Sequence, residues 1–124
     1  MPTSARWLPV IASLLLVAAC ASGGADACAE ASVTVEATVT ADALEPNALS
    51  VCKGQDVTLA LQSETDGEFH LHGYDEQVPE TSLTAGQTTT ITFTADAAGQ
   101  FIIELHPAAG EDEVEIGVLT VNEP

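Results

Sequence analysis

The sequence predicts an all-β fold, an antiparallel Greek-key β-sandwich or barrel of about seven or eight short strands. Three observations indicate it. Short runs alternate apolar and polar residues with a period of two, segments rich in turn residues separate these runs, and no window carries the apolar stripe of an amphipathic helix. Each run would therefore bury one face and leave the other in water.

The alternating runs follow one another from residue 33 to residue 121. Their apolar residues are Val33, Val35, Ala37 and Val39, then Val57, Leu59 and Leu61, then Phe69 and Leu71, then Ile91 and Phe93, then Phe101, Ile103 and Leu105. Turn-forming residues stand between these runs at 45–47, 53–56, 64–67, 84–87 and 95–99. The last run changes phase between Val118 and Leu119, and a β-bulge near Gly117 would reconcile its two halves.

The first twenty residues have the layout of a secretory signal peptide rather than of a membrane span. A single basic residue, Arg6, precedes an apolar stretch over 7–17, and small residues lead up to Cys20. A cysteine in this position resembles a bacterial lipobox, in which residues 1–19 are cleaved off and Cys20 is acylated. Several acyl chains anchor a protein stably to a membrane. The alternative is a buried cysteine in a plain signal anchor.

The remaining chain divides into a tether and a single domain. Residues 20–31 are the lipidated cysteine and a flexible tether, because the segment after Cys20 is small and polar. Residues 32–124 form the domain, since about a hundred residues suffice for one hydrophobic core and not for two. We expect an exported protein, anchored through Cys20 to the periplasmic or extracellular side of the cell envelope.

The chain is strongly acidic. It has 19 Asp and Glu residues against two basic residues, and its formal net charge is −17. One of the two bases, Arg6, belongs to the predicted signal peptide, so Lys53 alone remains after cleavage. Nucleic acid is excluded as a partner, because nothing could neutralise its phosphates. The acidic residues are scattered except at 111–115, which favours a solvated surface over a dedicated cation-binding strip.

Two cysteines follow the predicted lipidation site, Cys28 and Cys52. In an exported protein an even pair most simply forms a disulfide. Closing a loop of that length would contribute about 3.5 kcal/mol on the chain-entropy account. The alternative is that the two cysteines are thiolate metal ligands. It is less favoured, because free thiols outside the cell tend to oxidise.

The three histidines of the chain, His70, His72 and His106, share one strand phase. Phe69 and Leu71 mark the core side of their run, so His70 and His72 face the other way. By the same reasoning, Glu104 and His106 face away from the core. If the two runs are neighbours in one sheet, the three imidazoles and the carboxylate converge, and neutral imidazole suits copper, zinc, nickel or iron. The alternative is a solvated histidine face, or rings held by nearby carboxylates.

Several short motifs occur in order between residues 51 and 121. They are CKGQDVTL at 52–59, HGYD at 72–75, TAGQ at 84–87, ADAAGQF at 95–101 and GVLTV at 117–121. This series resembles the cupredoxin-like domains of bacterial exported proteins. It is most similar to the domains of small exported lipoproteins, and of proteins related to periplasmic iron-uptake components, that carry H-x-H-G-Y-D and a later E-L-H. The resemblance implies a β-sandwich and places His72 at the first copper ligand of true cupredoxins.

The chain departs from blue copper proteins at the remaining ligand positions. Leu105 stands about where their cysteine ligand would be, and His106 follows it. The segment 107–113 supplies no histidine or methionine, and the only methionine is Met1. Because the blue copper site depends on a strong copper–thiolate bond, a blue copper electron carrier is not expected.

The leading hypothesis is a non-enzymatic metal-binding lipoprotein that stores or delivers an ion at the envelope. His70, His72, His106 and Glu104 would bind copper or, in its place, zinc or iron, with Glu104 or Asp75 as an oxygen ligand or as a residue that orients a ligand. One alternative is a metal-free structural module whose acidic surface meets an envelope protein. The other is a zinc site with three histidines that activates water, with Glu104 as the base.

Overall fold

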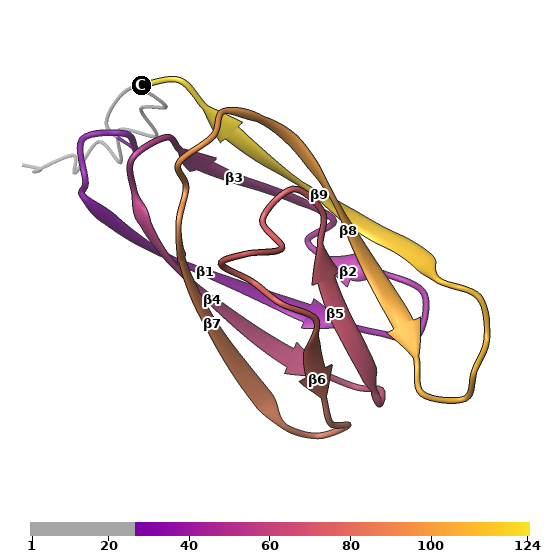
Figure 1. The fold of residues 1–124 in the computed structure, drawn as a ribbon. Coiled ribbons are helices and arrows are strands. Elements are labelled where there is room, and N and C mark those ends of the chain that lie inside the picture. The colour runs from indigo at the N-terminus through magenta and orange to yellow at the C-terminus, as the bar shows by residue number, and fades with distance from the viewer. Residues whose placement is uncertain (1–26) are drawn as a thin grey trace, which may run out of the picture.

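The computed structural model describes residues 27–124, which form a sandwich of two β-sheets (Figure 1). The first sheet has the strand order β2 (Leu44–Glu45), β1 (Ser32–Val39), β4 (Asp56–Ser63) and β7 (Thr88–Thr94). The second has the order β3 (Ala48–Cys52), β9 (Val114–Asn122), β8 (Gly99–Pro107), β5 (Gly67–Leu71) and β6 (Thr81–Leu83). The predicted all-β sandwich is confirmed. No helix in the described part of the chain is long and apolar enough to cross a membrane.

The core lies between the sheets, on the apolar phase of each strand. Phe69, Leu71, Ile103 and Leu105 are each at most 1% exposed, as the alternation in β5 and β8 predicts. Burying a side chain of this size contributes about 1.5–3 kcal/mol. The polar residues between them must therefore face out of the sandwich, because successive side chains of a strand point to opposite faces.

The sheets are mixed, although the sequence predicted antiparallel ones. β1 runs parallel to β4, and β3 runs parallel to β9. The chain passes from the first sheet to the second between β2 and β3. The parallel partners, β4 for β1 and β9 for β3, are therefore not the next strands along the chain. The described residues contain nine strands, whereas the sequence predicted seven or eight. The difference comes from β2 and β6, which have only two and three residues, too few to show an alternating pattern.

The predicted irregularity in the last strand is confirmed. Ile103 pairs with Gly117, but Glu104 pairs with Glu115, so Ile116 is an extra residue in β9. Ile116 is buried, and beyond it Glu115 lies opposite an outward-facing residue of β8. The bulge therefore turns the acidic start of β9 toward the outer side of the sheet.

The beginning of the described chain is fixed to one end of the sandwich. Cys28 and Cys52 form the expected disulfide, with Cα atoms 5.4 Å apart. The buried side chain of Gln55 accepts a hydrogen bond from the Cys52 amide at 2.8 Å and donates to the carbonyls of Ala27 and Glu30, each at 2.9 Å. Residues 27–31, which the sequence assigned to the tether, are thus attached to the domain, while Cys20 lies outside the described residues.

A candidate metal centre on the outer face of β5 and β8

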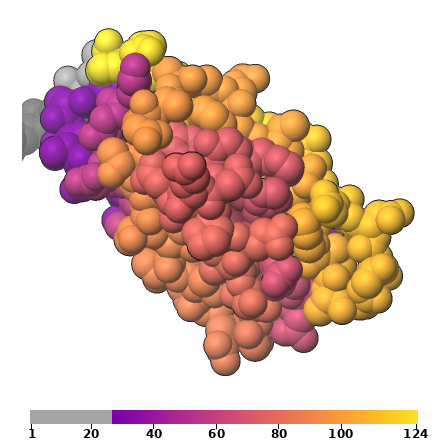
Figure 2. Space-filling model, viewed as in Figure 1, coloured from indigo at the N-terminus to yellow at the C-terminus, as the bar shows by residue number. Residues whose placement is uncertain are grey.

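The two histidine-bearing strands are neighbours, which was the condition for the histidines to converge. β5 and β8 are antiparallel, with His70 opposite Glu104 and Glu68 opposite His106. The segment 72–80, between β5 and β6, leaves the end of β5 and turns back to β6 (Figure 1), and it occupies the middle of the surface seen in Figure 2. Tyr74 and Val78 of this segment are buried in the core, whereas its Asp75 and Glu80 carboxylates lie beside the histidines. The segment thus borders the polar face of β5 and β8.

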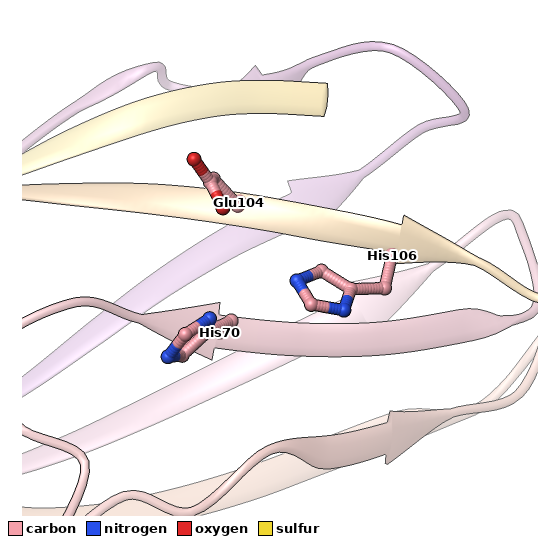
Figure 3. A group of neighbouring side chains, drawn as sticks. All are labelled: His70, Glu104 and His106. Carbon is pink, nitrogen blue, oxygen red and sulfur yellow. The ribbon is translucent and has the colours of Figure 1, made fainter. Parts of the chain in front are cut away.

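Three of the four predicted ligands lie within reach of one ion. His70, Glu104 and His106 each offer one ligand atom, and these atoms lie within 4.8 Å of one another. The ring centroids of His70 and His106 are 5.6 Å apart, and the rings are nearly perpendicular. Figure 3 shows the ring of His106 extending from β8 toward His70 and Glu104. Their side chains are 15–23% exposed, so the group is partly shielded and still open to an ion.

The fourth predicted ligand, His72, lies beside this group rather than within it. Its Nε2 atom is 2.8 Å from Oε2 of Glu104, and its ring centroid is 4.1 Å from that of His70. The hydrogen bond to Glu104 raises the pKa of His72 above its ordinary value, despite partial burial. The same bond lowers the pKa of Glu104. His72 is therefore placed to hold the Glu104 carboxylate in its ionised form.

Three further carboxylates surround the two rings. Oδ1 of Asp75 is 2.7 Å from Nε2 of His70, and this hydrogen bond lowers the pKa of Asp75. Oε1 of Glu80 is 3.6 Å from Nδ1 of His106, and Oε1 of Glu113 is 3.3 Å from its Nε2. Sequence reasoning named Asp75 but missed Glu80 and Glu113. The bulge near Gly117 was the available signal for Glu113, whereas Glu80 lies in an irregular connection that has no periodicity.

The donor set suits an ion that prefers nitrogen and oxygen ligands. Within residues 27–124, two buried side-chain nitrogens have no hydrogen-bond partner, Nδ1 of His70 and Nε2 of His106. A buried polar atom without a partner is costly and calls for an explanation. Both atoms belong to histidines of the group that also contains Glu104. The residues therefore fit a divalent ion such as Cu(II), which imidazole and carboxylate bind well.

Leu105, which the sequence resemblance places at about the cysteine of blue copper proteins, points the other way. Leu105 is 1% exposed and belongs to the hydrophobic core. Because Glu104 and His106 flank it in β8, their side chains leave the opposite face of the sheet. The histidine group thus lies outside the sandwich, on the other side of the strand from Leu105.

Comparisons with known proteins agree on the fold. A family model described as a cupredoxin-like domain matches residues 10–118. The dithionite-reduced auracyanin of Roseiflexus castenholzii is 25% identical, with a TM-score of 0.52 over 74% of this chain and 98% of that one. Auracyanin A of Chloroflexus aurantiacus, a "blue" copper protein, is 20% identical, with a TM-score of 0.57 over 73% and 99%.

A longer protein also contains this fold. The blue copper oxidase of Nitrosomonas europaea is 18% identical and has a TM-score of 0.61. The match covers 74% of this chain and only 39% of that one, so the two proteins share one domain and not a whole architecture. No curated protein matches the chain.

Proposed function

The chain belongs to the cupredoxin-like domain family, and on that premise we propose that it is a non-enzymatic copper-binding lipoprotein of the cell envelope. It holds the ion on the outer face of β5 and β8 and stores it or passes it on. The observation that carries this proposal is the pair of buried ring nitrogens without a partner, one on His70 and one on His106, beside the Glu104 carboxylate.

His70, His106 and Glu104 are the residues that would hold the ion, and His72 would support Glu104. An ion at this position would satisfy the two unpartnered nitrogens and neutralise the charge of the carboxylate. The bond from His72 keeps Glu104 ionised and oriented in the absence of the ion. A carboxylate that is already deprotonated and held in place has less ordering to lose when it binds a metal.

Copper is preferred over zinc and iron for two reasons. Sites of nitrogen and oxygen ligands bind Cu(II) more tightly than the other divalent ions of the first transition row. In addition, auracyanin A is described as a "blue" copper protein and the Nitrosomonas europaea protein as a blue copper oxidase. This second reason rests on fold similarity and is the weaker one.

The proposed role is not electron transfer by a blue copper centre. Leu105 stands about where the sequence resemblance places the thiolate ligand, and its side chain is directed into the core. Without a copper–thiolate bond, the site lacks the ligand that gives blue copper centres their electronic properties. The chemistry that remains is reversible binding, for which two histidines amid carboxylates are sufficient.

Anchoring through Cys20 is part of the same proposal. The disulfide between Cys28 and Cys52 supports an oxidising compartment, where such bonds persist. The net charge of −17 would repel anionic lipid headgroups and attract cations to the surface of the domain. A lipid-tethered domain of this charge would concentrate divalent ions close to the membrane without lying flat on it.

Metal content tests the proposal. The purified full chain and a variant with His70, His72 and His106 all changed to Ala are equilibrated with limiting Cu(II), Zn(II) and Ni(II) and then analysed by mass spectrometry. We expect one equivalent of copper in the parent and none in the variant. If neither protein retains metal, the proposal fails, and a metal-free interaction module with an acidic surface takes its place.

A further inference from the structure

We propose that Glu113, in the loop between β8 and β9, is a ligand of the ion, and that Asp75 is the positioning residue that directs Nδ1 of His70 toward it. This inference rests on the proposed metal binding and defines its ligand atoms. They are Nδ1 of His70, Nε2 of His106 and carboxylate oxygens of Glu104 and Glu113.

The tautomer of His70 follows from its contact with Asp75. A carboxylate only accepts hydrogen bonds, so at 2.7 Å from Oδ1 of Asp75 the Nε2 atom of His70 must carry the proton. The other oxygen of Asp75 accepts a bond from the Gly73 amide at 3.2 Å, which holds the carboxylate in place. Nδ1 of the neutral His70 ring then carries a lone pair. It is one of the two buried nitrogens that have no hydrogen-bond partner in the described part of the chain.

Glu113 lies next to the unpartnered nitrogen of the second ring. Its Oε1 atom is 3.3 Å from Nε2 of His106, yet this nitrogen makes no hydrogen bond to any described residue. Ligands that share an ion at about 2.0–2.1 Å lie about 3.0–3.4 Å apart. The separation of oxygen and nitrogen is therefore that of two ligands of one ion. The remaining nitrogen of this ring, Nδ1, faces the Glu80 carboxylate at 3.6 Å.

Glu113 reaches the proposed site through His106, the ring that its carboxylate meets. His106 and Glu104 both belong to the proposed site, so a cation that they bind would meet the Glu113 oxygen as well. The bulge in β9 is what brings the acidic start of that strand to this face.

Four single variants of the full chain test the ligand set, in two matched pairs. Glu113→Ala is compared with Glu111→Ala, which removes the same charge from the same loop, and Asp75→Ala with Glu76→Ala, its exposed neighbour. Cu(II) affinity is measured by titration against a competing chelator, and thermal unfolding of the metal-free proteins verifies the fold. We expect Glu113→Ala and Asp75→Ala to weaken binding about 10–100-fold and their controls less than about threefold.

A second readout needs no metal. Long-range proton–nitrogen correlation spectra of the metal-free chain, recorded at alkaline pH, report the tautomer of each neutral ring. We expect His70 to carry its proton on Nε2 in the parent and to populate both tautomers in Asp75→Ala, whereas Glu76→Ala resembles the parent.

The outcomes separate this inference from the proposed function. If the parent binds one equivalent of copper and Glu113→Ala binds as tightly as Glu111→Ala, Glu113 is not a ligand and the metal-binding function stands. A His70 ring protonated on Nδ1 would overturn the role of Asp75. If the parent binds no copper, the proposed function and this ligand set fail together.

Discussion

His70 and Glu104 are direct cross-strand partners in the antiparallel pair of β5 and β8. This single register position places an imidazole and a carboxylate side by side on the outer face of the sheet, and His106, two residues further along β8, completes the group. A slip of one residue in either strand would turn its polar side chains into the core. The buried Phe69 and Leu105, which are themselves partners, exclude that slip.

The geometry predicts unequal effects for two neighbouring histidines. His70→Ala removes a ligand and should lower Cu(II) affinity by more than about 100-fold, whereas His72→Ala removes only the partner of Glu104 and should lower it by about tenfold. Titration of both variants against a chelator measures the difference. Equal losses in the two variants would make His72 a ligand in its own right, as the sequence first suggested.

A cysteine at position 105 should not create a blue copper centre. Leu105→Cys places its thiol in the core, on the opposite side of β8 from the ring of His106. We expect copper to bind without the intense visible absorption of a copper–thiolate bond, and the smaller side chain to destabilise the fold by about 2 kcal/mol. Absorption spectra of the copper-loaded variant check this. A strong blue colour would show that the thiol at position 105 binds the copper, and it would contradict the placement of the ion on the outer face of the sheet.

The sequence was sufficient to predict which residues of β5 and β8 face outward. Alternation with a period of two is strong in both strands, and the core residues Phe69 and Ile103 occupy the expected phase. The sequence could not show that these strands are neighbours. They are separated by β6 and β7 along the chain, and strand pairing at that distance depends on the packing of both sheets.

The carboxylates were harder to predict than the histidines. Glu80 reaches His106 from the connection between β5 and β6, and Glu113 reaches it from the loop before β9. Neither residue lies in a periodic strand, so the alternation that predicted the direction of the histidine side chains does not apply to Glu80 or Glu113. The parallel pairing of β1 with β4 was missed for a related reason, since an alternating strand has the same pattern in either direction.

The metal-free protein should show a pH-dependent contribution from His72 and Glu104. The folded state raises the pKa of His72 above 6.5 and lowers that of Glu104 below 4.5. The stabilisation from His72 is thus complete below pH 6.5 and is lost as the pH rises through its folded pKa. That from Glu104 is complete above pH 4.5 and is lost on acidification.

The window of full stabilisation therefore lies between these values. In chelator-treated protein, the free energy of unfolding lost in His72→Ala should be larger at about pH 5.5 than at about pH 9, by no more than about 1 kcal/mol because the pair is partly exposed. Urea unfolding of parent and variant at both pH values gives this difference. A loss that increases toward pH 9 would contradict the assignment.

Gln55 should be essential to the attachment of residues 27–31. Gln55→Ala leaves the Cys52 amide and the carbonyls of Ala27 and Glu30 without their partner, so we expect the free energy of unfolding to fall by about 2 kcal/mol. Residues 27–31 should also become more sensitive to limited proteolysis. Gln62→Ala, at an exposed position of β4, is the control and should change stability by less than about 0.5 kcal/mol. Equal stability of the two variants would refute this role.

The position of the ion itself tests the central claim most directly. Crystals of the copper-loaded chain, with diffraction data collected on both sides of the copper absorption edge, locate the ion by its anomalous scattering. The account predicts one anomalous peak on the outer face of β5 and β8, between the rings of His70 and His106 and beside Glu104. A peak inside the sandwich near Leu105, or on surface carboxylates away from both rings, would contradict it.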